Sequence, residues 1–313
     1  MATNFDQWLT AKLTAPDRES AMGYHYVQTF MQDPYSWYLK YVRGLKPIHT
    51  KPALIKGGII HSAIEAAYLY DADSAHKTLA TLFDHRRTEY ENPEQHAADW
   101  RDSEVMLCAW LATWLTHDKD TYHLLHIEDP FELPLPNGFL ISVRFDALLQ
   151  SKTDGELRVL DHKTTGYSPM AAHKSLDDSD QSTCYQWAAS QLYPNNRIIG
   201  VESDVIFKRS NMRAAKCQRV GIVQRTPWYI DQWQIAMIAW LSDIARRVHM
   251  LNEGYPPAFA FPRGESYWGP NDWPGIYRAP LPDDPTEPPH GYTIDAWQQD
   301  RAQAILTLKE ATQ

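Results

Sequence analysis

Three residues of the segment 144–165 could form a catalytic site: Asp146, Asp161 and Lys163. In a β-strand, residues two apart point to the same side, so Asp161 and Lys163 share one face. Asp154-Gly155 is a strong hairpin signal between the two strands predicted for this segment. A two-residue loop places Asp146 opposite Lys163, whereas a four-residue loop places it opposite Asp161. In both registers the three side chains lie on one face, within reach of one another.

Converging carboxylates repel each other and favour a divalent cation between them, because the cation removes the repulsion. A lysine beside that cation can stabilise developing negative charge or hold a water molecule. Together these groups are typical of metal-assisted hydrolysis of a phosphodiester. The alternative is an exposed hairpin with ordinary charges on its solvent face, which Asp-x-Lys alone does not exclude.

Two further pairs of polar residues favour the catalytic interpretation. His61 interrupts an apolar helical pattern just after Gly57-Gly58, and Glu65 follows one turn later. A histidine on an apolar face is usually a satisfied core residue, but at the start of a tightly packed helix it can also reach a metal ion. Gln181 and Tyr185 are also one turn apart, and they suit either routine packing or contact with nucleotides.

These residues lie on a predicted series of helices and strands that begins with several helices. Helices are predicted over 22–42 with a break at Asp33-Pro34, from Gly57-Gly58 onward, and over 76–90 and 97–117. Consecutive strands are predicted over 128–135, 139–149 and 156–163. The remaining elements are a helix from about 180 to Pro194, strands over 198–207 and 216–224, and helices over 228–252 and 295–311.

This order predicts an α/β core with a helical insertion. We expect the main domain to span 1–279, with the insertion around 70–125. The segment 280–289 is rich in proline and acidic residues, which predicts an exposed arm. Residues 280–313 are therefore expected to form this arm and a C-terminal helix.

The composition predicts a folded chain that does not bind nucleic acid through its overall charge. Hydrophobic residues make up 43% and aromatic residues 12% of the chain, enough for a sizeable core. The net charge of −9 opposes nonspecific coating with nucleic acid, but it leaves room for a local basic groove. Candidate DNA contacts are Lys152, Arg144, Lys174, Lys208, Arg209, Arg213 and Lys216, the last four in a turn at 208–216.

The sequence predicts a soluble, cytoplasmic protein without a membrane partner. The N-terminus lacks a basic stretch followed by an apolar one, and no window approaches the roughly eighteen apolar residues of a membrane span. Cys108, Cys184 and Cys217 are too widely spaced for a disulfide framework, a zinc site or an iron–sulfur site. We therefore expect buried, reduced thiols.

The order of the motifs resembles the RecB-type branch of the PD-(D/E)XK nuclease superfamily, which includes CRISPR-associated adaptation exonucleases and phage exonucleases. The resemblance covers about 20–265 and includes Phe30–Pro47. The motifs are Gly57…His61, Asp146, Asp161-His162-Lys163-Thr164 and Gln181-Ser-Thr-Cys-Tyr185. The resemblance implies a restriction-endonuclease-like core, with a mixed β-sheet flanked by helices.

The resemblance also implies a set of metal ligands. His61, Asp146 and Asp161 would bind Mg²⁺ or Mn²⁺, and the main-chain carbonyl of His162 would be a further ligand. Glu65 is a lesser candidate, acting through water.

Catalytic and DNA-positioning roles follow from the same resemblance. Lys163 would be the catalytic lysine, and Gln181 with Tyr185 would help to position DNA beside the active site. Several members of the branch carry an iron–sulfur cluster. In this chain Asp33-Pro34 stands where a Cys-Pro is expected, and 255–280 contains no cysteine, so we expect no cluster.

Two functional hypotheses follow. The first is a metal-dependent deoxyribonuclease, an exonuclease that acts on DNA ends or single strands. The second is a catalytically silent nuclease fold that binds nucleic acid or a host protein complex; the net charge and the acidic arm favour it, whereas the complete set of metal ligands opposes it. A metal hydrolase with another substrate is a third hypothesis. If a phage encodes the protein, we expect it in the host cytoplasm.

Overall fold

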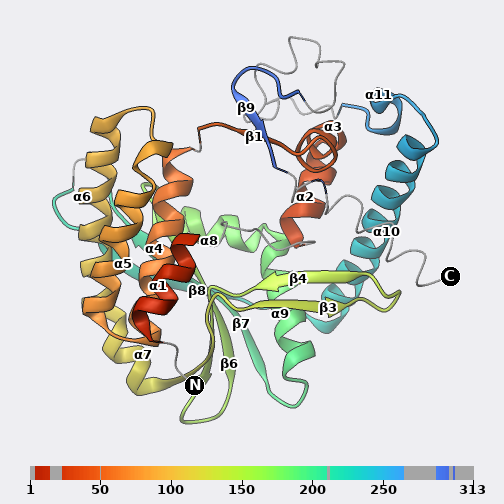
Figure 1. Cartoon of the computed structure of the whole chain (residues 1–313). Helices are drawn as coiled ribbons and strands as arrows, with labels where there is room; N and C mark the ends of the chain where they lie inside the picture. Colours follow the sequence, from red (N-terminus) through yellow and green to blue (C-terminus); the bar gives the residue numbers. More distant parts are fainter. Residues whose placement is uncertain are drawn as a thin grey trace. The chain divides into compact units, whose positions relative to one another are not determined.

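The structure, a computed structural model, divides into two compact units (Figure 1). It describes residues 4–14, 23–49, 51–209, 212–263, 287–295 and 299. The first unit combines 1–19, 50–131 and 143–230, and the second combines 20–49, 132–142 and 231–313. All the predicted site residues lie in the first unit.

A five-stranded mixed sheet forms the centre of the first unit. Its strands, in spatial order, are β2 (Tyr122–His126), β5 (Ala147–Ser151), β6 (Leu157–Thr165), β7 (Ile198–Phe207) and β8 (Lys216–Val223). β6 and β7 are parallel, and every other neighbouring pair in this sheet is antiparallel. This mixed sheet with flanking helices confirms the predicted restriction-endonuclease-like α/β fold.

Helices cover both faces of the sheet (Figure 1). One face packs against α4 (Pro52–Leu69) and α6 (Pro93–Trp110), which share a core with α5 (Ala72–His85) and with Ile206 of β7. Val205 and Phe207 point to the other face, where Ala172 of α8 (Pro169–Asp177) contacts them. α9 (Asp180–Leu192) also packs on β6 and β7. The alternation of side chains along β7 therefore separates the two helical layers.

Local capping signals set where these helices begin. Asn92 accepts hydrogen bonds from the backbone at the start of α6, and Asp71 does the same for α5. Both helices consequently start four residues before their predicted first residues. The sequence predicted that Gly57-Gly58 opens a helix. That prediction was wrong, because α4 begins at Pro52 and the two glycines lie inside it.

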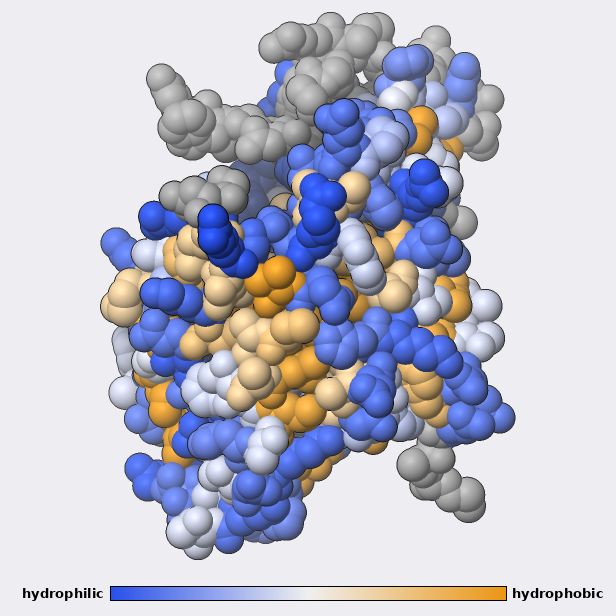
Figure 2. Space-filling model, turned by 90° about the vertical axis from the view of Figure 1, so that its left-hand side faces the viewer, coloured by the Kyte–Doolittle hydropathy of each residue, from blue (hydrophilic) through white to orange (hydrophobic). Residues whose placement is uncertain are grey.

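The remaining elements of the first unit are short. They are α1 (Phe5–Thr14), η2 (Arg87–Glu89), the π-helical turn η3 (Leu111–Leu115) and α7 (Thr116–Thr121). η3 and α7 continue α6, so the helical stretch predicted to end at 117 reaches 121. On the side of the molecule where α5 and α6 lie, hydrophilic residues cover most of the surface and a group of hydrophobic residues lies near its centre (Figure 2).

The strand prediction was wrong in two respects: one predicted strand is two strands, and β2 was missed. The run predicted over 139–149 is two strands, β4 (Leu140–Arg144) and β5, which are separated at Phe145-Asp146. β4 pairs with β3 (Pro130–Pro134) in a separate two-stranded sheet. β2 and α8 had not been predicted, because their short segments carry no distinct periodicity. The break between β4 and β5 places Asp146 outside regular strand structure.

The second unit contains an aromatic core. It comprises α2 (Tyr24–Gln32), α3 (Pro34–Trp37), η1 (Tyr38–Val42), β1 (Leu45–Pro47), most of α10 (Pro227–Asn252), α11 (Pro257–Ala260) and β9 (Tyr292–Ile294). Asp33 ends α2 and caps α3, which confirms the predicted break. Trp37 stacks on Phe261 at 5.3 Å between ring centroids. β1 pairs with β9 antiparallel.

Some predictions fall outside the described residues. Most of the predicted arm at 280–289 and of the final helix at 295–311 lies there. Among the described residues, no helix is long and apolar enough to cross a membrane. All three cysteines are free thiols, but only Cys184 is buried and Cys108 is exposed, so the expectation of burial was wrong for Cys108.

Gly200 is required for the pairing of β7 with β8. Its φ is +131°, and a Cβ there would lie 2.4 Å from the carbonyl oxygen of Val223. We expect Gly200→Ala to lower the free energy of unfolding by about 3 kcal/mol or more, measured by chemical denaturation. The control is Gly57→Ala, whose methyl group would meet Thr164 Oγ1 at 3.5 Å. It should preserve stability or raise it by about 1 kcal/mol; equal losses in both variants would contradict the role of Gly200.

Candidate functional site

Asp161 and Lys163 project from β6 and contact each other. Oδ1 of Asp161 lies 2.8 Å from Nζ of Lys163, which confirms the shared face expected from strand periodicity. Asp161 is fully buried, and among the described residues its Oδ2 has no hydrogen-bond partner. A buried carboxylate oxygen without a donor is rare in native structures and fits a site for a cation.

Asp146 stands opposite Asp161 in the break between β4 and β5. Ala147 pairs with Leu160, which is the register of the four-residue loop; the alternative register, with Asp146 opposite Lys163, is wrong. Oδ2 of Asp146 accepts a hydrogen bond of 2.7 Å from the backbone N–H of His162. The carboxylate thus satisfies the strand's backbone at the point where β5 has not yet begun.

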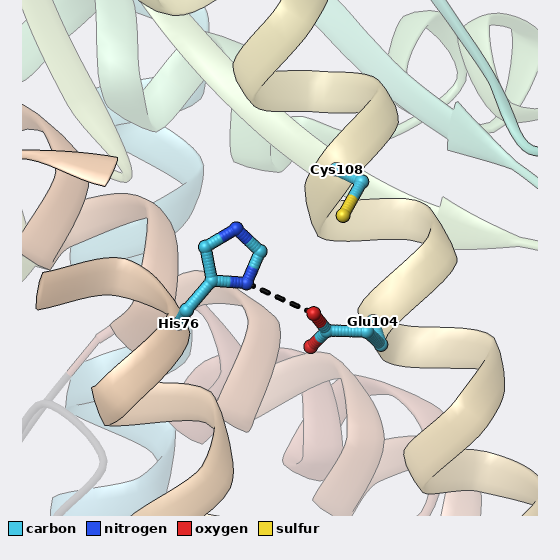
Figure 3. A group of neighbouring side chains, drawn as sticks. All are labelled: His76, Glu104 and Cys108. Carbon is cyan, nitrogen blue, oxygen red and sulfur yellow. Dashed lines mark ion pairs between the residues drawn. The ribbon is translucent and has the colours of Figure 1, made fainter. Parts of the chain in front are cut away.

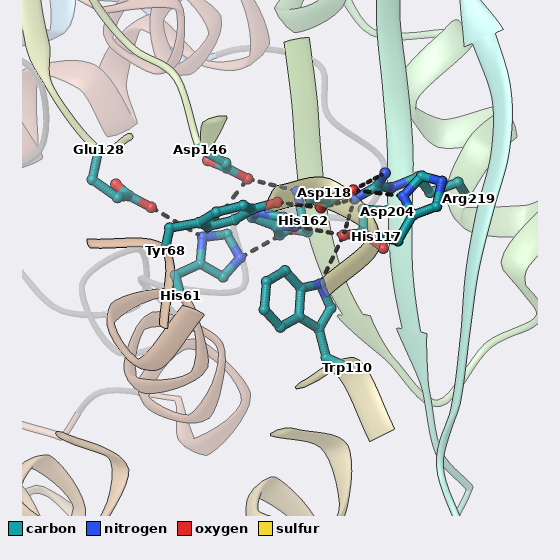
Figure 4. A network of polar contacts seen from close by, with 10 residues as sticks. All are labelled: His61, Tyr68, Trp110, His117, Asp118, Glu128, Asp146, His162, Asp204 and Arg219. Carbon is teal, nitrogen blue, oxygen red and sulfur yellow. Dashed lines mark hydrogen bonds and ion pairs between the residues drawn. The ribbon is translucent and has the colours of Figure 1, made fainter. Parts of the chain in front are cut away.

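His61 projects from the middle of α4 towards Asp146 (Figure 4). Its Nε2 is 2.9 Å from the carbonyl oxygen of His162, and its Nδ1 is 3.4 Å from Oε1 of Glu128. Burial by itself lowers the pKa of His61, but the carboxylates of Asp146 and Glu128 outweigh it and raise this pKa to about 9. The imidazole therefore carries a proton at neutral pH, and both ring nitrogens can donate.

Glu128 is a member of the site that the sequence did not reveal. It lies in the bend between β2 and β3 with a φ of +50°, an uncommon conformation for a residue with a side chain. Burial raises the pKa of Glu128, but His61 and Arg144 bring it below its usual value. One ligand atom each from His61, Glu128 and Asp146 lies within 4.8 Å of the others. Nothing in the sequence distinguishes Glu128 from Asp129 beside it.

Glu65, the lesser candidate, is held by α1. Its carboxylate pairs with Lys12 at 2.6 Å and accepts a hydrogen bond from Nε1 of Trp8. Burial raises the pKa of Glu65, and Lys12 opposes this shift. The carboxylate is thus held by two residues of α1, and the negative charge of Glu128 also raises its pKa.

Gln181 and Tyr185 meet each other on α9, as their spacing predicts. Nε2 of Gln181 donates a hydrogen bond of 3.0 Å to the hydroxyl of Tyr185. The ring of Tyr185 is buried and packs against Phe145. Burial raises the pKa of the Tyr185 hydroxyl well above its usual value, and the negative charge of Asp146 adds to this shift. This hydroxyl therefore stays protonated beside the acids, while Gln181 remains partly exposed.

A buried ionic network anchors the strand from behind (Figure 4). The His162 ring points to the opposite face of β6, where Nδ1 lies 3.0 Å from Oδ2 of Asp204. The same carboxylate oxygen accepts a hydrogen bond from Nε1 of Trp110. Arg219, which lies 3.8 Å from Asp204, forms a bidentate pair with Asp118. These contacts fix the main chain of His162, which carries both the N–H bound by Asp146 and the carbonyl that faces His61.

Some basic residues proposed for DNA contact are engaged elsewhere. Lys208 Nζ lies 2.6 Å from Oδ1 of Asp102, and this side chain is largely buried, so the prediction for Lys208 was wrong. Arg209 lies over the ring of Phe207. Arg213 and Lys216 are exposed. Only part of the predicted basic turn is therefore placed to meet a polyanion.

Neutralising Glu128 tests the electrostatic coupling of the site. In metal-free Glu128→Gln protein, we expect the pKa of His61 to fall below about 9, towards the ordinary value of about 6.5, because the imidazolium loses a negative neighbour. NMR titration of the His61 ring measures this. In the wild-type protein the raised pKa of His61 stabilises the fold below pH about 6.5, and this stabilisation is lost as the pH rises through about 9. The free energy of unfolding of Glu128→Gln should therefore fall less than that of the wild type over this pH range.

The matched control for this titration is Asp129→Asn. Asp129 is the next residue along the chain, is largely exposed and pairs with His126. This substitution should leave the pKa of His61 unchanged. An unchanged pKa in Glu128→Gln as well would refute the coupling.

A comparison with known protein families identifies the superfamily of the chain. A sequence profile of the PD-(D/E)XK nuclease superfamily matches residues 24–258, well over half of the chain. Nucleases of this superfamily use divalent metal ions, and the carboxylate and imidazole groups of the site suit such an ion. The search of curated proteins found no match. The matched segment contains the whole ionic site, and the chain belongs to the PD-(D/E)XK nuclease superfamily.

Proposed function

We propose that the protein is a metal-dependent DNA exonuclease of the RecB-type branch, which hydrolyses phosphodiester bonds at DNA ends or in single strands. The observation that carries the proposal is the convergence of His61, Asp146 and Asp161 with Lys163 around β6, the central strand of the sheet. Membership of the nuclease superfamily supports hydrolytic nuclease activity and a nucleic-acid substrate.

The donor set suits Mg²⁺ or Mn²⁺. Asp146, Asp161 and the main-chain carbonyl of His162 supply the oxygen ligands that such ions prefer, and His61 supplies a nitrogen. Once bound, the ion supplies a Lewis acid and a water of lowered pKa. Glu128, on the Nδ1 side of His61, is proposed to set the orientation of the imidazole.

Lys163 is proposed to act on the substrate directly. Burial lowers the pKa of its ammonium group, but Asp161 and Asp146 outweigh burial and raise it, so the group stays charged. Its side chain is about one-third exposed (38%), which leaves the ammonium within reach of a phosphate. Asp161 holds this charge in place, so that it can stabilise negative charge developing on the scissile phosphate.

The finer features of the proposal rest on the resemblance. The order of the four motifs supports assignment to the RecB-type branch, whose CRISPR-associated and phage members are exonucleases. Gln181 is partly exposed beside the acids, where it is proposed to position DNA. Arg213 and Lys216 are proposed to bind the phosphate backbone. A phage origin and a place in the host cytoplasm belong to the same proposal.

Removing single charges tests the site. With Mg²⁺ or Mn²⁺, we expect Asp146→Asn, Asp161→Asn and Lys163→Ala each to lower the rate of DNA hydrolysis by about a hundredfold or more, because each loses a charge used in catalysis. Release of labelled nucleotides measures the rate, and Asp129→Asn serves as the control with full activity. Full activity in any of the three variants would refute the site. A wild-type protein that binds the metal and DNA without cleaving would establish the silent binding module instead.

The dependence on ends separates an exonuclease from an endonuclease. We expect linear single-stranded or duplex DNA to be degraded from a labelled end. Covalently closed circles of the same sequence should stay intact, because they offer no end. The matched control is the circle after it has been opened by a single cut. Equal cleavage of closed and opened circles would show an endonuclease.

A further inference from the structure

Three side chains from two helices form a second group of potential metal ligands (Figure 3). His76 belongs to α5, whereas Glu104 and Cys108 belong to α6. Nδ1 of His76 lies 3.0 Å from Oε1 of Glu104. The thiol of Cys108 completes the group, in which one ligand atom from each residue lies within 4.8 Å of the others.

The packing of the two helices produces this arrangement. Glu104 and Cys108 are four residues apart, so they occupy one face of α6. Ala75 and Leu79 of α5 share a buried core with Leu107 of α6, and this core closes the seam between the helices. His76 and the α6 pair lie along that seam. His76 and Glu104 are half-buried and Cys108 is exposed, so an ion can reach the group from solvent.

The chemistry of this group differs from that of the nuclease site. A sulfur, an imidazole nitrogen and a carboxylate oxygen are ligands of Zn²⁺, which is borderline-soft and accepts all three. Mg²⁺ prefers oxygen ligands and has little affinity for a thiol. Ligands of a tetrahedral zinc ion lie roughly 3 to 4 Å apart, as its bond lengths require, and small side-chain rotations bring the three groups into that range.

We propose that His76, Glu104 and Cys108 form a zinc site that joins α5 to α6. Three protein ligands leave the fourth position of a tetrahedral ion to water. On binding, the thiol of Cys108 loses its proton to solvent and its sulfur bonds the ion; the imidazole of His76 binds in its neutral form. The ion replaces the direct contact between His76 and Glu104 and links the two helices of the insertion.

The thiol is not activated for other chemistry. Partial removal of the thiol from water raises the pKa of Cys108, and the negative charge of Glu104 raises it further. A nucleophilic or redox-active cysteine has a lowered pKa, because its thiolate is the reactive form. The surroundings of Cys108 therefore suit a metal ion, whose positive charge reverses the effect of Glu104, better than they suit a nucleophile.

Titration of the full-length protein with Co²⁺, a spectroscopic substitute for Zn²⁺, tests the proposal. We expect a thiolate-to-cobalt charge-transfer band that rises to saturation as Co²⁺ is added and disappears when Zn²⁺ is added. The nuclease site contains no cysteine, so its metal cannot produce this band, and failure of the nuclease proposal would leave the result intact.

Three variants assign the ligands. Cys108→Ser should abolish the band, whereas the matched control Cys217→Ser should keep it. His76→Ala should weaken Co²⁺ binding by at least the roughly tenfold that loss of even an outer-shell partner causes. No charge-transfer band at millimolar Co²⁺, or a band that survives in Cys108→Ser, would overturn the proposal.

Thermal unfolding gives a second readout that does not depend on the band. Zn²⁺ should raise the Tm of the wild-type protein more than that of Cys108→Ser, in which Zn²⁺ can bind at the nuclease site alone. Because Cys108 is exposed, the two metal-free proteins should unfold at the same temperature, which excludes misfolding as the cause. An equal rise in Tm for both proteins would contradict a site at Cys108.

Discussion

The burial of three carboxylates is the constraint on which the site depends. The carboxylates of Glu128, Asp146 and Asp161 are each mostly or fully buried around a single imidazole. Desolvated carboxylates are stable only when cations or hydrogen-bond donors compensate them. In the described structure the compensation comes from the protonated His61, from Lys163 and from the backbone N–H of His162. A divalent ion supplies positive charge as well, so the burial of carboxylates that makes the site costly to fold also suits it to such an ion.

The rest of the first unit holds these charges in place. The sheet breaks at Asp146 so that its carboxylate can take a backbone N–H that a neighbouring strand would otherwise bind. Glu128 adopts a left-handed backbone conformation, and such strain persists only where the surroundings enforce it. Behind β6, Asp204 connects the His162 ring to Trp110, so the helical insertion supports the strand that carries the acids. The geometry of the ionic site and the packing of the core are thus joined through β6.

Much of the fold and part of the site could be predicted because their signals are local. The shared face of Asp161 and Lys163 follows from the two-residue period of a strand, and the contact of Gln181 with Tyr185 follows from one helical turn. The register of the hairpin could not be decided, because two loop lengths satisfy the same turn signal and keep the same face. The strand break at Asp146 also escaped prediction, since its apolar neighbours continue the strand pattern on both sides.

Residue types and their positions along the chain were enough to predict the available chemistry and the face of each element that carries it. Which of these faces meet follows from the packing of the folded chain alone. Glu128 reaches His61 through a bend with no distinctive composition. Cys108 lies near His76 across the seam of α5 and α6, although the spacing of the cysteines argued against a zinc or iron–sulfur site. The physical reason is that side-chain direction within one strand or helix follows from backbone period. Proximity between elements depends instead on how their apolar faces pack, and that packing leaves no mark in the spacing of the polar residues it brings together.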